Sequence, residues 1–264
     1  MARCAWLCSL LLALLAARAE ARQAAEAAVA KPRFKTTRAQ QSRPRVRGAR
    51  ERRLADIRAL FARAGLDYPP AQVLMRIFKS EDKLELWVRK ARSRDFVHLK
   101  DYAICARSGE LGPKRKRHDG QVPEGFYTIT AYNSASSFLL AMLVSYPNRS
   151  DLVRKHGRDP GGAICIHGDC VTIGCVPLTD RWIEELYVIC LDSKTWSGQP
   201  NLVHIFPARL HGESWDKLVN EHAAEPALLD FWKELKAGYD LFEQTRRQPR
   251  IWFTGRGAYR FRAR

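Results

Sequence analysis

Hydrophobic and polar residues alternate over several stretches of the chain, and a period of two predicts β-strands. Residues 73–79 and 83–89 form the clearest pair, with residues 80–82 as the turn of a hairpin. Further strand-like runs follow at 96–99, 102–106, 126–132, 138–143, 163–167 and 202–206. Their spacing and the loops between them favour a mixed, β-rich α+β fold, a β-sandwich with flanking helices, over a doubly wound sheet.

Apolar residues recur at helical spacing in three other segments. The first covers residues 54–64, the second covers residues 180–189 and the third covers residues 214–243. Apolar positions between residues 251 and 261 then predict a return to strands. With 264 residues, the chain is expected to form one main domain with a helical C-terminal extension.

The N-terminus starts with a positive charge, followed by an apolar stretch over residues 4–17 that is short for a membrane span. Ala19 and Ala21 then provide the Ala-x-Ala spacing of a cleavage site. We therefore expect a signal peptide over residues 1–21 and export of the mature protein.

Residues 31–53 carry ten Lys and Arg side chains against the single Glu51, and supply much of the net charge of +17. Because such a run cannot bury itself, residues 22–71 are expected to form a basic, solvated, flexible arm with one short helix. The arm would bind an anionic envelope surface, and the alternative is a charged linker without a binding role. Nucleic acid is not expected as a partner, because the chain shows no nucleic-acid-binding motif.

Five cysteines remain after the predicted cleavage, at positions 105, 165, 170, 175 and 190. An odd number in an oxidising compartment leaves at least one thiol unpaired, while the pairing of the others is open. Cys175 follows Gly174 and lies eight residues after His167, which Gly168 follows. A thiol needs a nearby base to become a thiolate, and glycines let the backbone aim N–H groups at an oxyanion. The pattern predicts a cysteine nucleophile with a histidine base.

The same residues allow other interpretations. A lone histidine such as His167 is ordinarily a satisfied core residue. Zinc prefers Cys and His ligands, which are present as Cys165, His167, Cys170 and Cys175, but the run lacks a paired C-x-x-C knuckle. Cys165 and Cys190 are more typical of buried, inert thiols. We therefore expect no metal and no organic cofactor.

The run 166–178, which contains Ile-His-Gly and then Thr-Ile-Gly-Cys-Val-Pro-Leu, resembles the signature of the L,D-transpeptidase catalytic domain, the YkuD domain. It is most similar to the YafK-like branch, in which the insert between histidine and cysteine is short. Other segments resemble the same branch, at 109–114, 119–127, 146–148, 231–232 and 236–240. The resemblance implies a catalytic domain over residues 72–210 and a helical extension over residues 211–264 that packs on it.

The resemblance also implies a mechanism. Cys175 would attack the amide carbonyl after the third residue of a peptidoglycan tetrapeptide stem, with His167 as general base and then as proton donor. A backbone carbonyl near Gly168 would orient the imidazole, and backbone N–H groups of Ile173, Gly174 and Cys175 would bind the oxyanion.

The chain departs from the family's pattern beside the nucleophile. The usual His or Lys two places before the cysteine is Ile173, and the usual Arg two places after it is Pro177. Thr172 can replace the usual serine hydroxyl. Since the replaced residues help the family to place the substrate or to hold the loop, the mode of substrate binding is an open question here.

Three function hypotheses follow. The leading one is a peptidoglycan L,D-transpeptidase that acts through a cysteine thioester in cell-wall cross-linking or remodelling, and so in cell shape. The second is an L,D-specific hydrolase on the same site that trims stems or releases envelope protein, and the third is a non-catalytic basic module that binds the envelope or nucleic acid. We expect a monomer in the periplasm or cell envelope of a bacterium, with stem peptides and an envelope protein or anionic surface as partners.

Overall fold

The computed structural model describes residues 37–264, so the predicted signal peptide lies outside the described residues. In chain order, the elements are α2 (Thr37–Gln41), α3 (Pro44–Arg63), β1 (Gln72–Phe78), β2 (Lys83–Arg89), β3 (Phe96–Ala103), β4 (Gly125–Asn133), β5 (Ala141–Val144), α4 (Arg149–Arg154), β6 (Cys165–His167), β7 (Val176–Pro177), α5 (Asp180–Ser197), β8 (Leu202–Phe206), α6 (Gly212–Glu221), α7 (Pro226–Thr245), β9 (Arg250–Phe253) and β10 (Tyr259–Arg262).

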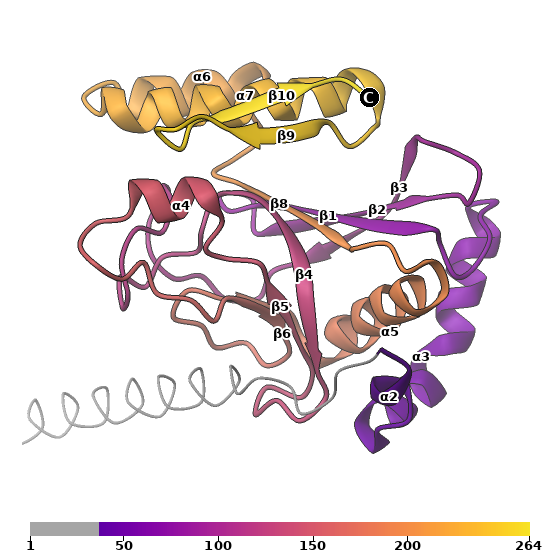
Figure 1. Ribbon diagram of the computed structural model, residues 1–264. Coiled ribbons are helices and arrows are strands. Elements are labelled where there is room, and N and C mark those ends of the chain that lie inside the picture. The colour runs from indigo at the N-terminus through magenta and orange to yellow at the C-terminus, as the bar shows by residue number, and fades with distance from the viewer. Residues whose placement is uncertain (1–36) are drawn as a thin grey trace, which may run out of the picture.

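One large curled sheet organises the molecule, with the strand order β3-β2-β1-β8-β4-β5-β6-β7 (Figure 1). It is mixed, because β1 runs parallel to β8 and β6 runs parallel to β7, while the other neighbours are antiparallel. Helix α5 lies within the curl, and its residues 183 and 186–191 belong to the same apolar core as β1, β2 and β5. The predicted fold class, a mixed α+β fold with flanking helices, is confirmed.

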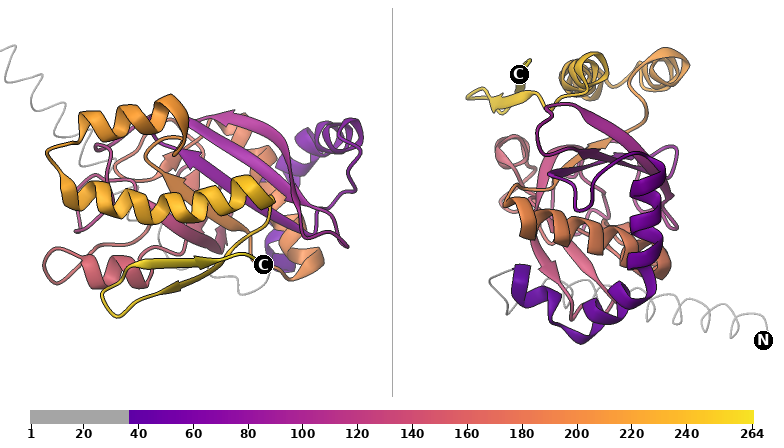
Figure 2. Two further views of the ribbon diagram at one scale, coloured as in Figure 1. Left: turned by 90° about the horizontal axis from the view of Figure 1, so that it is seen from above. Right: turned by 90° about the vertical axis from the view of Figure 1, so that its right-hand side faces the viewer.

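The C-terminal segment forms a layer of its own over one side of the sheet, in which α6, α7 and the β9–β10 hairpin lie side by side (Figure 2). A second apolar core joins this layer to the sheet. Phe78 and Phe206 supply its sheet side, and Trp232 and Tyr239 of α7 supply the other. The fully buried Arg76 of β1 adds a charged link, because its Nη1 lies 2.6 Å from Oε1 of Glu243 on α7.

The structure corrects the prediction of a solvated arm for residues 37–53. Helix α3 begins at Pro44, ten residues before the expected helix, and packs against α5. Val46 and Ala49 extend the buried face that Ile57 and Phe61 continue. Three arginines of this helix form ion pairs with carboxylates of α5.

Two carboxylates of α5 pair with the arginines of α3. Asp192 pairs with Arg50, and Glu184 pairs with both Arg52 and Arg53. Arg50, Arg52 and Arg53 therefore take part in a contact between α3 and α5. The sequence of α3 alone does not reveal this contact. In the part of the chain that the structure describes, no helix is both long and apolar enough to cross a membrane.

Candidate active site

Two short parallel strands bring the predicted catalytic residues together. His167 ends β6, and Cys175 immediately precedes β7. Because Ile166 pairs with Val176 in this ladder, the residues one position earlier, Cys165 and Cys175, also lie side by side. The backbone N–H of Cys165 points at Sγ of Cys175, 3.3 Å away.

His167 is held in a fixed orientation. Its Nδ1 lies 2.6 Å from the carbonyl oxygen of Gly168, so Nδ1–H donates there and leaves Nε2 for the thiol. The imidazole stacks on Phe138, with 4.5 Å between ring centroids. Burial lowers the pKa of His167, but the hydrogen bond and charge interaction with Cys175 outweigh burial, so that the pKa is raised. The contact with the Gly168 carbonyl is the one expected from the sequence.

Cys175 is buried, its thiol donates to the carbonyl oxygen of Ala163 at 3.7 Å, and several neighbouring groups change its pKa. A hydrogen bond from the Cys165 thiol is the largest influence, and it lowers the pKa of Cys175. Burial opposes this effect, and the hydrogen bond and positive charge of His167 add to it, so the pKa lies well below its ordinary value. The pKa of Cys165 moves in the opposite direction, because its proton stays on the hydrogen bond to Cys175. The two shifts therefore act in the same sense, because both favour transfer of the Cys175 proton to His167.

Thr172 organises the loop before the nucleophile. Its Oγ1 accepts hydrogen bonds from the N–H groups of Gly174 at 3.2 Å and Cys175 at 2.9 Å, and donates to the carbonyl of Cys175 at 2.9 Å. The expected oxyanion role of the Gly174 and Cys175 N–H groups is therefore not present in this conformation. The N–H of Ile173 has no acceptor among the described residues.

The glycines of the loop are required by close contacts. A Cβ on Gly168 would lie 2.8 Å from Ile183 and 3.0 Å from the carbonyl of Phe138. Gly174 has a φ of +133° and passes close to the Gln121 carbonyl. Asp180, at the start of α5, accepts the N–H of Asp169 at 3.0 Å, so the helix supports the loop.

A disulfide joins Cys105 to Cys170 and ties this loop to the segment that follows β3. The pairing was left open by the sequence. It removes Cys170 from the zinc interpretation, and among the described residues no group of three or more His, Cys, Asp or Glu side chains could hold a metal ion. The remaining free thiols of this part of the chain are Cys165, Cys175 and Cys190, all buried.

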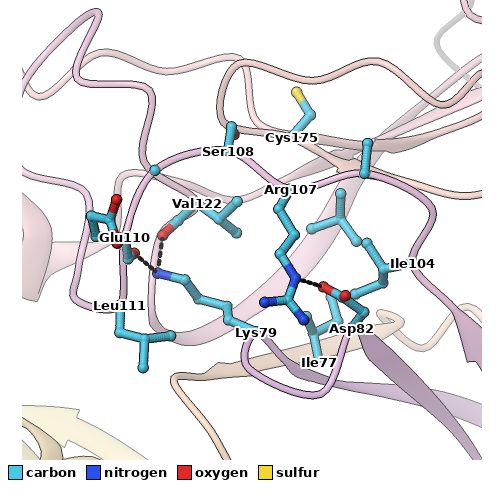
Figure 3. Close-up of a pocket in the computed structure, with 13 residues that line it drawn as sticks. Ile77, Lys79, Asp82, Ile104, Arg107, Ser108, Glu110, Leu111, Val122 and Cys175 are labelled. Atoms are coloured by element: carbon cyan, nitrogen blue, oxygen red, sulfur yellow. Dashed lines mark hydrogen bonds and ion pairs between the residues drawn. The ribbon is translucent and has the colours of Figure 1, made fainter. Parts of the chain in front are cut away.

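A pocket of about 130 Å³ opens beside the nucleophile (Figure 3). Cys175 and Val176 lie at one end of it, and residues 106–111 form a wall. Arg107 extends across the pocket to an ion pair with Asp82, while Lys79 donates to the carbonyls of Glu110 and Val122. The pocket therefore offers a thiol, several apolar side chains and charged groups to one bound molecule.

A second buried histidine and a basic run of the chain do not take part in the contacts of His167 and Cys175. His204 is buried against Gln248, and burial lowers its pKa to about 3. The basic run 114–117 is anchored by ion pairs from Lys114 to Asp119, from Arg115 to Asp151 and from Arg117 to Asp159. These side chains therefore hold loops together. Cys165 is a buried, free thiol as expected, but its contact with Cys175 was not predicted, because it depends on the register of β6 and β7. The contact of Phe138 with His167 was not predicted either, because it depends on the path of a loop.

A buried cysteine that lines a pocket and lies near a buried histidine is an arrangement that suits acyl transfer. Residues 76–205 match the model of the L,D-transpeptidase catalytic domain, YkuD. The chain is also 37% identical over 182 residues to the protein named "Putative L,D-transpeptidase YafK" of Escherichia coli (strain K12), covering 68% of this chain and 70% of that one. The chain belongs to the L,D-transpeptidase catalytic-domain family.

Solved structures of low sequence identity are also similar. The helical cell shape determining protein Pgp2 from Campylobacter jejuni matches with a TM-score of 0.42 and 16% identity, over 69% of this chain and 73% of that one. Bd1075 of Bdellovibrio bacteriovorus matches with a TM-score of 0.40 and 16% identity, over 72% of this chain and 79% of that one.

Proposed function

We propose that this protein is an L,D-transpeptidase that acts on peptidoglycan tetrapeptide stems, with Cys175 as nucleophile and His167 as general acid and base. The observation that carries the proposal is the placement of Cys175 and His167 on the paired strands β6 and β7, with Cys175 lining a pocket. Family membership and the name of the Escherichia coli relative support the substrate class.

In the first half-reaction, the Cys175 thiolate attacks the carbonyl carbon of the amide that follows the third stem residue. The C–N bond breaks, and His167 gives its Nε2 proton to the leaving amine of D-alanine. We propose the N–H of Ile173 as an oxyanion donor, because it has no acceptor among the described residues. The N–H groups of Gly174 and Cys175 would join it only after they leave Thr172.

In the second half-reaction, an acceptor amine attacks the thioester and gives its proton to His167, and the thiolate leaves. An amine of a neighbouring stem yields a cross-link, whereas water in its place yields a shortened tripeptide. Export to the periplasm or cell envelope fits this substrate, and the Cys105–Cys170 disulfide supports an oxidising compartment.

Incubation of the purified protein with tetrapeptide muropeptides, followed by mass spectrometry, tests the proposal. We expect cross-linked dimers from wild type and from Cys190→Ala, which removes a buried thiol of α5 that does not line the pocket. Cys175→Ala should give neither dimers nor the thioester intermediate. If wild type forms tripeptides but no dimers, the proposed activity is wrong and the protein is a hydrolase. Full activity of Cys175→Ala would overturn the assignment of Cys175 as the nucleophile.

A further inference from the structure

The β9–β10 hairpin has two chemically different faces. Ile251, Phe253, Tyr259 and Phe261 belong to the apolar core shared with α7. The residues that alternate with them along β9 and β10 point to the opposite face of the hairpin and are exposed. This exposed face consists of Arg250, Trp252, Arg260 and Arg262, which we call the Arg/Trp face.

The register of the hairpin concentrates charge on this face. Arg250 is directly opposite Arg262, and Trp252 is directly opposite Arg260. Like charges directly opposite each other are unfavourable in a sheet. None of these three arginines has a carboxylate partner among the described residues, unlike Arg50, Arg52 and Arg53 of α3. Trp252 on the same face is 47% exposed, although its side chain is large and apolar.

The positive charge continues into a cleft of about 980 Å³ between the hairpin and the ends of β1 and β2. Arg89, Arg94 and Arg247 line this cleft together with Arg250 and Arg262 of the Arg/Trp face. Of the three, Arg247 has an acidic partner, Asp95. The cleft therefore has a large excess of cationic side chains over anionic ones.

The cleft is separate from the candidate active site. Gln72 at the start of β1 lines the cleft, whereas Ile77 near its end lines the pocket of Cys175. Five residues of strand span roughly 17 Å at about 3.3 Å per residue. Occupation of the cleft therefore leaves the pocket open.

We propose that the Arg/Trp face and the adjoining cleft dock on the phosphate headgroups of an anionic lipid surface. Arginine pairs with phosphate through two parallel N–H groups, and tryptophan prefers the interface between headgroups and acyl chains. A polyanion of the nucleic-acid class would match the charge but not the compartment, because the Cys105–Cys170 disulfide indicates an oxidising one. Each arginine near such a surface contributes about a fivefold gain in affinity.

The test uses the full chain and sedimentation with vesicles of phosphatidylcholine alone or with phosphatidylglycerol added. Wild type should bind the phosphatidylglycerol vesicles preferentially, and Arg250→Gln with Arg262→Gln should weaken that binding at least tenfold, by two losses of about fivefold each. The matched control, Arg58→Gln with Arg63→Gln, removes two exposed arginines of α3 and the same net charge, and should bind within about twofold of wild type. Trp252→Ala should weaken binding in the same direction.

Hydrogen exchange gives a local measurement, because residues 247–262 should gain protection on phosphatidylglycerol vesicles and not on phosphatidylcholine alone. Equal loss of binding in the control pair, displacement by millimolar inorganic phosphate, or a stronger affinity for a DNA oligonucleotide would each overturn the proposal. Activity on soluble muropeptides should stay at the wild-type level in the hairpin variants, so a failure here is distinguishable from a failure of the proposed function.

Discussion

Gly168→Ala is the substitution that most directly tests how the backbone orients His167, the proposed general acid and base. The added Cβ would lie 2.8 Å from Cγ2 of Ile183, 2.9 Å from Oδ1 of Asp180 and 3.0 Å from the carbonyl oxygen of Phe138. These atoms belong to a helix and to a neighbouring backbone, so Gly168 itself has to shift. Overpacking of this kind costs about 1–3 kcal/mol. For a domain of this size the melting temperature should fall by roughly 2–12 °C, from about 2–4 °C per kcal/mol.

The same shift moves the Gly168 carbonyl that accepts from Nδ1 of His167. We expect thioester formation to slow by about 10- to 100-fold, since small displacements of catalytic groups have effects of this size. Gly162→Ala is the matched control, because a Cβ there meets no atom within 4 Å. Urea unfolding and stopped-flow acylation measure the two effects. If Gly168→Ala and Gly162→Ala behave alike in both measurements, the orienting role of this carbonyl is wrong.

Three further predictions address the thiolate, the N-terminal helix and a buried histidine. Cys165→Ala should move the pH profile of Cys175 alkylation to higher pH, and Cys165→Ser should move it less because a hydroxyl still donates. Phe61→Ala should lower the free energy of unfolding by about 3–5 kcal/mol in urea titrations, because its ring is buried; a loss below about 1 kcal/mol would contradict the packing of α3. Since burial lowers the pKa of His204 to about 3, the unfolded state takes up a proton first as pH falls from about 6.5. Acid should therefore destabilise wild type relative to His204→Gln between those pH values, and parallel stability curves would contradict this.

The sequence predicted best where a segment carries its own pattern. The hairpin expected at 73–79 and 83–89 is β1 and β2, because alternation and the turn between the strands agree. One helix was expected over residues 214–243, yet the structure has α6 and α7. Pro226 occupies the first turn of α7, where its missing N–H is tolerated, and so begins a new helix.

Other elements have no apolar period or depend on partners that are distant in sequence. Helix α4 has six residues and no apolar period, and it is fixed by a local capping box, in which the Asn148 side chain accepts the N–H of Asp151 while the Asp151 side chain accepts that of Asn148. The first half of α3 is stabilised by carboxylates of α5, more than 130 residues later in the chain. The composition of α3 indicates its charge but not the residues that neutralise it.

The candidate site was also predicted only in part from the sequence, and its cysteines show why. The spacing of His167 and Cys175 is local, so a motif could reveal it. Cys165, Cys170 and Cys175 lie within ten residues of one another, yet the ladder of β6 and β7 turns Cys165 toward the nucleophile, while Cys170 reaches Cys105 across 65 residues. Because Cys170 is already bonded to Cys105, it cannot capture Cys175 in a disulfide. The thiol that lies beside Cys175 is therefore Cys165, and its hydrogen bond lowers the pKa of Cys175.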